Sequence, residues 1–513
     1  MHPSIYAQST PNKPAIIMAK TGEIISYKEL DDASNRAANL FRSEGIEIGD
    51  KIAIMLENEA QYFEILWGAQ RSGLYYSCIS TKLTAADLEY IIRDSGAKML
   101  IISHSLGKLA DELAAILPNT KLFMIGGTHP KYKSWEQVSA TQSASRIADE
   151  RAGADLFYSS GTTGRPKGII KPIAENPEIA VLDPLTKAAI EVFGFCDETI
   201  YLSPAPLYHA APLRWCVRTM KVGGTVIVMD KFDAEESLRL IDKYKPNTSQ
   251  WVPTHFIRML KLPQEVRAKY DVSSMKCAIH AAAPCPISVK EAMIAWWGPV
   301  ICEYYAGTEG NGMTMIKTED WLSHKGSVGT PVMGTPHIMD ENQNEVGANI
   351  EGVIYFEGTV PFTYHNDPEK TTASRNEKGW STLGDIGYLD QDGYLYLTDR
   401  ASFMIISGGV NIYPQEIENI LAAHPHVLDS AVIGAPDEIM GEKVVAVIQL
   451  VNPQLASEEL KDEIRLWLRP QLSGVKMPRQ IDFIDELPRH ATGKLYKRVL
   501  RDVYWAESKS KLV

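Results

Sequence analysis

The sequence predicts an α/β fold of layered sheets in which most strands pair in parallel. Short apolar segments alternate with longer segments of helical periodicity through the first half of the 513-residue chain. Apolar residues make up 45% of the sequence, enough for a large core. At about 150 residues per domain, the length favours roughly three structural units.

Each element follows from a local pattern. Residues 26–47 are expected to form an amphipathic helix, because Ser26 and Glu29 fit a capping box and apolar residues recur at helical spacing. Further helices are expected over 60–72, 85–95 and 458–468, and one through Ile417 and Leu421. Strands are expected over 51–55, 98–102, 121–125, 200–203, 224–229, 249–252, 277–280, 427–434 and 444–450.

Composition excludes several classes of protein. The net charge is -12 and no long run of Lys or Arg occurs, which argues against general nucleic-acid binding. The six cysteines form no Cys-x-x-Cys pair, so small core residues are expected rather than a zinc site or disulfides. Met1–Lys20 lacks a signal-peptide pattern, and no run of about 18 apolar residues occurs. We expect a cytoplasmic protein without an integral membrane segment.

Tyr158–Gly168 is the most informative segment, with three glycines, four Ser/Thr hydroxyls and one lysine. Glycines allow close backbone approach, successive N–H groups can surround an anion, and Lys167 adds a point charge. The pattern indicates a loop that holds a polyphosphate. A Walker A loop is excluded because Pro166 precedes Lys167 and Gly168 follows it. The alternative for the segment alone is a solvent-exposed turn.

The motif Ser-Gly-Thr-Thr-Gly-x-Pro-Lys-Gly resembles the phosphate loop of the adenylate-forming superfamily, which includes acyl-CoA synthetases, adenylation domains and firefly-type luciferases. The resemblance covers essentially the whole chain through five motifs in order. It implies binding of the phosphates of ATP by Ser159, Ser160, Gly161, Thr162, Thr163, Gly164 and Lys167. His209 follows Pro204-Ala-Pro-Leu-Tyr and matches a histidine that gates the acyl pocket rather than a general base. From residues alone, a structural histidine is the more common case.

Two further segments resemble the family's adenine and metal motifs. The small residues Ala282, Ala283 and Pro284 would lie against the adenine, although a tightly packed strand end explains them equally well. Tyr304-Tyr-Ala-Gly-Thr-Glu309 resembles the Tyr-Gly-x-Thr-Glu motif, with Ala306 and Gly307 in the nucleotide site. In this resemblance Tyr305 stacks on adenine, Thr308 donates to the α-phosphate, and Glu309 holds Mg²⁺ through its carboxylate.

The last motifs lie in the C-terminal third. Asp385 resembles the aspartate that accepts from both ribose hydroxyls, and its alternative is a turn residue after Gly384. Asp392-Gly393 predicts a type I′ hairpin turn. Arg400 resembles the ribose-contacting arginine, and Lys494 resembles the catalytic lysine of the C-terminal Gly-Lys motif.

The resemblance implies an α/β architecture with a large N-terminal domain of layered sheets, which includes a small β-barrel-like part, and a small mobile α+β C-terminal domain. We expect the large domain at 1–399, a hinge linker at 400–403 and the small domain at 404–513. One departure concerns the hinge, because Ser402 and Phe403 stand where the family usually has charged residues.

The implied activity is that of an ATP-dependent, AMP-forming carboxylic acid–CoA ligase with ATP, Mg²⁺ and coenzyme A. Lys494, Thr308, Glu309 and His209 are its expected catalytic residues. The segment from Glu303 and the tail from Leu487 are similar to enzymes for fatty, steroid or bile acids. Small residues that leave room for a bulky acyl group are Ala210, Ala211, Ala282, Ala283 and Gly307.

Three alternatives stay open. An aryl-acid ligase of the coumarate or benzoate type shares every motif. A stand-alone adenylation domain would load a carrier protein, although no carrier domain follows residue 513. A catalytically inactive binding protein is disfavoured by the retention of Lys167, Glu309, Asp385, Arg400 and Lys494. The partners expected are the acid, ATP and CoA, without nucleic acid, and a homodimer is left open.

Overall fold

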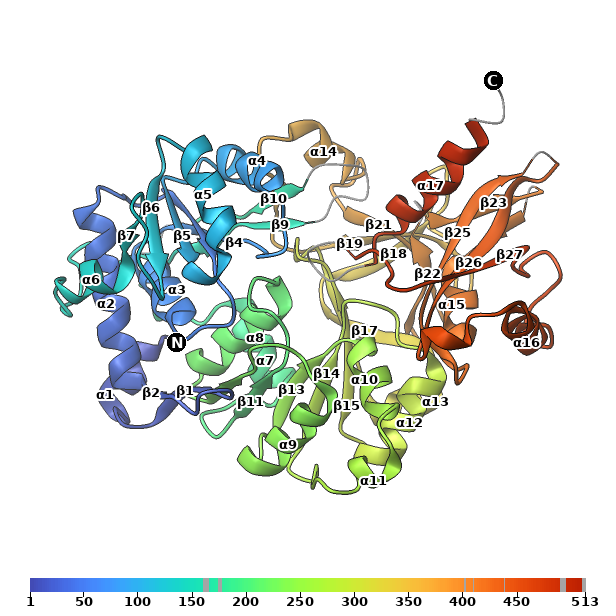
Figure 1. Cartoon of the computed structure of the whole chain (residues 1–513), viewed down its shortest axis with the longest axis horizontal. Helices are drawn as coiled ribbons and strands as arrows, with labels where there is room; N and C mark the ends of the chain where they lie inside the picture. Colours follow the sequence, from blue (N-terminus) through green and yellow to red (C-terminus); the bar gives the residue numbers. More distant parts are fainter. Residues whose placement is uncertain are drawn as a thin grey trace. The chain divides into compact units, whose positions relative to one another are not determined.

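The computed structural model describes residues 1–159, 166–173, 178–400, 403–408, 410–437, 439–489 and 495–509, with the backbone alone at 159, 399, 400 and 507–509. The chain divides into two compact units. Unit 1 comprises Met1–Gln250, Lys269–Ala278 and Pro361–Thr372, and unit 2 comprises Trp251–Ala268, Ile279–Val360 and Ala373–Val513. Figure 1 shows both units and labels the helices and many of the strands.

Unit 1 contains, wholly or in part, ten helices among the residues described. They are α1 (Pro3–Ser9), α2 (Tyr27–Ser43), α3 (Gln61–Arg71), α4 (Ala85–Ser95), α5 (Gly107–Ile116), α6 (Trp135–Ala140), α7 (Pro184–Phe193), α8 (Ala210–Lys221), α9 (Ala234–Tyr244) and α14 (Pro368–Ala373). Its strands are β1 (Pro14–Met18), β2 (Ile24–Ser26), β3 (Lys51–Met55), β4 (Tyr75–Cys78), β5 (Met99–Ser103), β6 (Lys121–Ile125), β7 (Lys133–Ser134), β8 (Ala154–Asp155), β9 (Phe157–Ser159), β10 (Lys167–Ile170), β11 (Ile200–Ser203), β12 (Thr225–Val228), β13 (Thr248–Trp251) and β20 (Thr363–Tyr364).

A six-stranded sheet of unit 1 has the order β7-β6-β5-β3-β4-β8, and all its pairings are parallel. Helices α4 and α5 pack on one of its faces through residues such as Leu88 and Leu113, which share a core with Leu100 and Ile102 of β5. Strands β1, β12, β11 and β13 also pair in parallel. The predicted α/β class is therefore confirmed for this part of the chain.

Local sequence signals position the helices of unit 1. Ser26 accepts from the backbone N–H of Glu29 while the Glu29 carboxylate accepts from the backbone N–H of Ser26, which is the predicted capping box. Helix α2 ends at Ser43, earlier than the predicted residue 47, because Gly45 adopts a left-handed φ of 72°. Helix α4 and strands β3, β6 and β11 have the predicted bounds.

Unit 2 contains the last residue of α14 and seven further helices among the residues described. They are α10 (Pro253–Leu260), α11 (Gln264–Arg267), α12 (Ile287–Trp297), α13 (Thr318–Ser323), α15 (Pro414–Ala422), α16 (Glu458–Leu468) and α17 (Lys497–Lys509). Its strands are β14 (Cys277–His280), β15 (Ile301–Ala306), β16 (Met313–Lys317), β17 (Ser327–Met333), β18 (Thr335–Met339), β19 (Gly352–Glu357), β21 (Ser381–Leu389), β22 (Leu395–Arg400), β23 (Ile405–Ser407), β24 (Val410–Ile412), β25 (Val427–Asp437), β26 (Gly441–Leu450) and β27 (Gln480–Ile484).

The middle of unit 2 departs from parallel pairing. Strands β15, β16, β17, β22, β21, β19 and β18 follow one another in the sheet, and each pairing is antiparallel. Short connections explain the change, since an antiparallel pair needs only a turn whereas a parallel pair needs a crossover. Where two of these paired strands follow one another directly in the chain, a turn or loop connects them. The one connection of this kind that contains a helix among the described residues is β16 to β17, with the six-residue α13.

The C-terminal part of unit 2 is a smaller α+β layer. Strands β24, β23, β26 and β25 form an antiparallel sheet, and β27 pairs with β26 in parallel. Val432 shares a core with Ile417 of α15 and Ile464 of α16, whereas its neighbour Ile433 shares another core with Leu500 of α17. Because successive side chains of a strand point to opposite faces, the helices cover both faces of this sheet.

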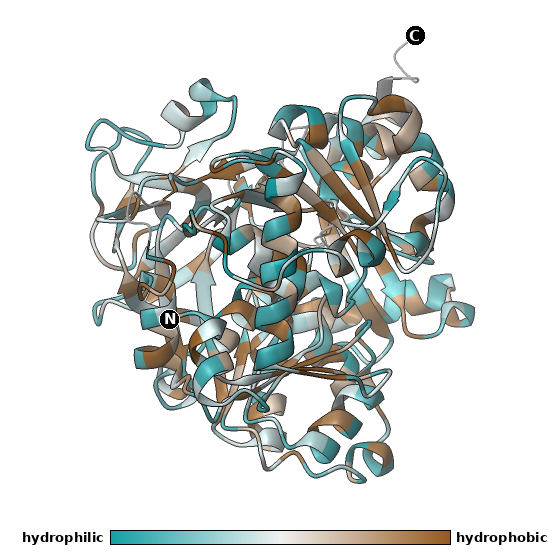
Figure 2. Cartoon of the chain, turned by 90° about the vertical axis from the view of Figure 1, so that its left-hand side faces the viewer, coloured by the Kyte–Doolittle hydropathy of each residue, from teal (hydrophilic) through white to brown (hydrophobic). Residues whose placement is uncertain are grey.

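Strands and helices differ in hydropathy, as Figure 2 shows: many strands are brown, whereas helices carry both brown and teal residues. This is the pattern of sheets covered by amphipathic helices. No helix within the described ranges is long and apolar enough to cross a membrane.

The cysteine prediction holds in part. Cys78, Cys216, Cys277 and Cys302 are buried and Cys285 is half-buried, and all six thiols are free. For Cys196 the prediction of a core position is wrong, because this side chain is exposed in the turn between α7 and β11.

Candidate active site

The predicted phosphate loop connects the two strands of a hairpin in unit 1. Strands β9 and β10 pair antiparallel, and Ser159 lies opposite Lys167 in their register. The loop is thus closed at its base by backbone pairing. The predicted residues Ser160, Gly161, Thr162, Thr163 and Gly164 lie outside the described residues, as does the side chain of Ser159. Their role stays a prediction.

Lys167 has an anionic neighbour within unit 1. Its Nζ lies 3.4 Å from Oδ2 of Asp367. The backbone N–H of Lys370 lowers the pKa of Asp367 most strongly, and Lys167 lowers it further. The Lys167 and Asp367 side chains are 22% and 35% exposed, and an ion pair that solvent reaches in this way is weak. An incoming phosphate can therefore replace the aspartate as the partner of this ammonium group.

Gly168 is closely packed beside Lys167. A Cβ at this position would lie 3.0 Å from Cζ of Tyr158 and 3.1 Å from Cβ of His365. The Tyr158 hydroxyl donates to Asp94 over 2.6 Å, which holds the tyrosine ring in place. A side chain at 168 would require Tyr158 or His365 to shift by a few tenths of an ångström.

His209 is the N-cap residue of α8 in unit 1. The helix begins at Ala210, and the small residues Ala210 and Ala211 lie in its first turn. The His209 ring meets the ring of Tyr208 edge to face, with 4.6 Å between centroids. His209 is half-buried, which suits contact with a ligand, and its gating role stays a prediction.

The predicted adenine segment of unit 2 follows β14. Ala281 is buried, whereas Ala282, Ala283 and Pro284 are exposed. Ala282 has a φ of 75°, a left-handed conformation that costs a non-glycine residue about 1–2 kcal/mol. The alternative of a tightly packed strand end is not met at these exposed positions. A strained backbone at the carboxyl end of a strand is typical of ligand-binding segments.

Strand β15 carries the second predicted nucleotide motif. Tyr304, Tyr305, Ala306, Gly307 and Thr308 are half-buried. The strand ends at Ala306, and this regular extended position accepts alanine in place of the family's glycine. The Tyr305 hydroxyl donates to Oδ2 of Asp385 over 2.6 Å, so two residues predicted for adenine and ribose meet directly.

Asp385 and Arg400 are brought together by the β21–β22 pairing. They are direct partners in the register of the two strands, which places both predicted ribose ligands at one position of the sheet. Asp385 is buried, with 8% of its surface exposed. It is therefore a strand residue, and the alternative of a turn residue after Gly384 is wrong. The side chain of Arg400 lies outside the described residues.

The predicted magnesium ligand Glu309 is also buried, with 8% of its surface exposed. A Cβ on Gly307 would lie 2.9 Å from Oε2 of Glu309 and 2.3 Å from Cδ1 of Leu383, so a side chain at this position would push the ends of both side chains aside. The glycine leaves the backbone close to the carboxylate. A buried carboxylate beside a bare backbone fits a site for Mg²⁺ and phosphate oxygens.

The C-terminal predictions lie largely outside the described residues. This applies to Lys494 and to the hinge residues Ala401 and Ser402. Phe403 is described, and the ammonium group of Lys497 lies 5.3 Å from the centre of its ring. Lys497 in turn pairs with Glu418 at 2.7 Å. The predicted hinge ring therefore contacts α17.

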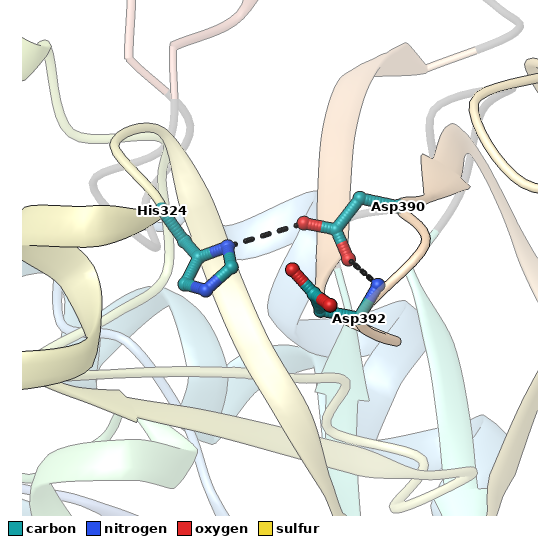
Figure 3. A group of neighbouring side chains, drawn as sticks. All are labelled: His324, Asp390 and Asp392. Atoms are coloured by element: carbon teal, nitrogen blue, oxygen red, sulfur yellow. Dashed lines mark hydrogen bonds and ion pairs between the residues drawn. The ribbon is translucent and has the colours of Figure 1, made fainter.

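One group of metal-ligand type occurs among the described residues, and Figure 3 shows it. His324 Nδ1 lies 3.2 Å from Oδ2 of Asp390, and Oδ1 of Asp390 accepts the backbone N–H of Asp392 and of Tyr394. These bonds fix the connection between β21 and β22. The predicted type I′ turn is wrong here, because Gly393 has a positive φ and Asp392 does not.

Comparison with known proteins identifies the family. The family described as "AMP-binding enzyme" matches residues 5–363, and the family described as "AMP-binding enzyme C-terminal domain" matches residues 416–494. The chain belongs to the AMP-binding enzyme family. It is an enzyme of the adenylate-forming superfamily, in the class of AMP-forming acid–thiol ligases that use ATP, Mg²⁺ and coenzyme A.

Named relatives span most of the chain. It is 30% identical to the long-chain-fatty-acid–CoA ligase FadD13 of Mycobacterium tuberculosis, over 98% of this chain and 97% of that protein. It is 29% identical to the fatty acid–[acyl-carrier-protein] ligase ScoC of Streptomyces coeruleorubidus, over 99% and 97%. The solved anthranilate CoA ligase AuaEII, in complex with anthranoyl-AMP, is 25% identical with a TM-score of 0.84, over 98% and 96%.

Sequence reasoning missed several partners of these residues. Asp367 beside Lys167, Asp94 beside Tyr158, and Lys290 beside Glu303 were not identified. The partners of Lys167 and Tyr158 come from distant parts of the chain, and Lys290 lies 13 positions before Glu303, so no short motif contains both members of a pair. Only the family-typical spacing within each motif was visible in the sequence.

Proposed function

We propose that the chain activates medium- or long-chain fatty acids, or polycyclic acids of the steroid or bile-acid type, as AMP-forming acid–CoA ligase. The observation that carries the proposal is the Tyr305–Asp385 hydrogen bond beside the Asp385–Arg400 strand pair. It gathers the residues predicted for adenine and ribose around one buried carboxylate. A surface that only bound proteins would not need this arrangement.

In the first half-reaction, a carboxylate oxygen of the acid attacks the α-phosphorus of ATP. The bond from this phosphorus to the bridging oxygen breaks, and pyrophosphate leaves with the electron pair. Negative charge shifts among the phosphoryl oxygens, so positioned cations and N–H donors lower the barrier. Lys167, Lys494 and Thr308 are the groups of this chain that supply them. Glu309 would hold Mg²⁺, and the ion would supply positive charge to neutralise the phosphates.

In the second half-reaction, the thiol sulfur of coenzyme A attacks the acyl carbonyl carbon. The bond from this carbon to the AMP oxygen breaks, AMP leaves with the electron pair, and the thiol proton passes to solvent. We propose that the small domain, 404–513, turns about the linker 400–403 against the large domain, 1–399, between the two steps. A hinge of a few residues suits such a change.

Two observations support the substrate class: small residues leave space for a bulky acyl group, and two similar proteins are named for fatty acids. Ala210, Ala211 and Gly307 are small and half-buried, and Ala282 and Ala283 are small and exposed. FadD13 and ScoC are named for fatty acids. Each buried CH₂ contributes roughly 0.8 kcal/mol, so a long chain gains several kcal/mol over acetate.

A second candidate is transfer of the acyl group to a carrier protein, as the name of ScoC states for that relative. An aryl acid is the third, since AuaEII is named for anthranilate. Both share the first half-reaction with the proposed enzyme. They differ in the acid accepted or in the thiol that receives the acyl group.

The test is CoA-dependent release of AMP with a panel of acetate, octanoate, palmitate, a steroid carboxylic acid, 4-coumarate and anthranilate. We expect kcat/KM for octanoate, palmitate or the steroid acid to exceed that for acetate by about two orders of magnitude or more. Preference for acetate or an aryl acid contradicts the proposed substrate class. Turnover with a holo-carrier protein, and none with coenzyme A, assigns the second candidate.

A further inference from the structure

Three ionisable side chains of unit 2 meet in a place closed to solvent. Nζ of Lys290 lies 2.7 Å from Oε2 of Glu303, and Nε2 of His280 lies 3.5 Å from the same oxygen. The side chains of Lys290 and His280 are 0% exposed, and that of Glu303 is 7% exposed. The Lys290 ammonium group also lies 4.7 Å from the centre of the Trp321 ring.

Such a cluster is not explained by stability. Burial raises the pKa of Glu303, and Lys290 opposes this shift. Burial, followed by the charge of Lys290, lowers the pKa of His280 well below its usual value, so the imidazole is neutral. Two buried opposite charges lose their hydration, and apolar residues of similar volume are often as stable. The position of the pair in the fold therefore needs another reason.

The three residues lie on three elements that precede, follow or contain the predicted nucleotide segments. His280 is the last residue of β14, directly before Ala281–Pro284. Lys290 lies in the first turn of α12, just after that segment, and its backbone N–H bonds to Pro286. Glu303 lies in β15, two residues before Tyr305, so the two side chains share one face of the strand.

We propose that Glu303 is a positioning residue that sets the adenine-binding segment after β14 against Tyr305. The inference rests on the proposed function, because it assumes that both segments contact the nucleotide. From the strand that carries Tyr305, one carboxylate oxygen of Glu303 bonds to Lys290 at the start of α12 and packs 3.5 Å from the neutral His280 ring at the end of β14. The Lys290–Glu303 bond fixes the spacing between Ala281–Pro284 and Tyr305, the two segments expected to contact the adenine. Ala282, with its left-handed backbone, lies between these anchored ends.

The decisive variant removes both charges together. In Glu303→Gln/Lys290→Met no buried charge is left without a partner, so we expect a folded protein with a melting temperature close to that of the wild type. The single variants Glu303→Gln and Lys290→Met serve as further arms, although each leaves a charge unpaired. If the cluster only supports the core, the double variant binds nucleotide as the wild type does.

The experiment measures AMP binding to the full-length protein by calorimetry, together with the KM values for ATP and acid. For the double variant we expect the Kd of AMP and the KM of ATP to rise by about tenfold to a hundredfold, the scale for a small misplacement. The KM of the acid and the melting temperature should change little. Asp31→Asn is the matched control, because Asp31 pairs with the buried Arg71 of unit 1 at 3.0 Å, and no predicted site residue belongs to that pair.

The outcomes distinguish failure of the positioning role of Glu303 from failure of the proposed function. A double variant that is stable and binds AMP within twofold of the wild type overturns the positioning role alone. Equal weakening of AMP binding by Asp31→Asn also overturns it, since any buried ion pair would then have the same effect. A wild-type protein that binds no AMP overturns the proposed function as well.

Discussion

The phosphate-side and nucleoside-side residues of the candidate site are held in different ways. On the phosphate side, in unit 1, Lys167 is 22% exposed and 3.4 Å from its partner Asp367. On the nucleoside side, in unit 2, Asp385 is buried and bonded to Tyr305 over 2.6 Å. A weakly held cation can exchange its partner for a phosphate oxygen, whereas a buried carboxylate is oriented before the ligand arrives. We therefore expect loss of a cation at the phosphates to affect the rate, and changes at the nucleoside residues, or at a competitor for Lys167, to affect binding.

Lys494→Ala should give the largest effect, because this lysine of the C-terminal motif is expected to act on the phosphates. Loss of one charge-stabilising donor should lower the rate of acyl-adenylate formation by about a hundredfold or more. Thioester formation from synthetic acyl-AMP should be retained, because that step does not transfer a phosphoryl group. Single-turnover measurement of both steps checks this. An equal loss in both steps would contradict the assignment of Lys494 to adenylation.

Asp385→Ala is the corresponding change on the nucleoside side. Hydrogen bonds to a charged group contribute about 1.5–3 kcal/mol, so the KM of ATP should rise roughly tenfold to a hundredfold. The KM of the acid should change little. Steady-state kinetics with each substrate varied gives both values. An unchanged dependence on ATP would mean that Asp385 only supports the sheet.

Tyr305→Phe sharpens the comparison, because it keeps the ring and removes the hydroxyl that donates to Asp385. A single hydrogen bond contributes about 0.5–1.5 kcal/mol, so the KM of ATP should rise about two- to tenfold. The rise should be smaller than for Asp385→Ala. If Tyr305→Phe weakened ATP binding more than Asp385→Ala, the ring rather than the carboxylate would be the main determinant.

Asp367→Asn should give the smallest effect, and in the opposite direction. It removes the anionic partner of Lys167, and exposed ion pairs contribute about 0–1 kcal/mol. The KM of ATP should therefore fall by up to about fivefold. A clear rise in this KM would show that Asp367 holds Lys167 in place instead of competing with phosphate. Asp32→Asn, in an exposed pair with Lys28 outside all predicted site segments, is a suitable control.

Much of the fold was predictable because its signals are local. The capping box at Ser26 and the strand before Pro204 each depend on a few consecutive residues. The antiparallel order of β15–β22 was not predicted, since it depends on pairing between distant segments. The connection at Asp390–Tyr394 was predicted with the wrong turn type, because the side chain of Asp390 organises it from outside the Asp392-Gly393 pair.

The site was predictable only through whole motifs. Tyr305, Glu309 and Asp385 were identified by resemblance, and no pattern in the residues alone distinguishes Asp385 from a turn residue. Their contacts could not be predicted, because Tyr305 and Asp385 are 80 positions apart. The Lys290–Glu303 pair escaped notice for another reason. The residues around a lysine on a helix do not show whether its side chain is buried or exposed.

The central claim is that the chain joins an acid to the AMP part of ATP before any thiol takes part. The most direct test is exchange of radiolabelled pyrophosphate into ATP by the purified protein with Mg²⁺, in the absence of coenzyme A. The account predicts exchange that depends on an added fatty or polycyclic acid and that is lost in Lys494→Ala. Exchange that occurs without any acid, or that requires coenzyme A, would contradict it.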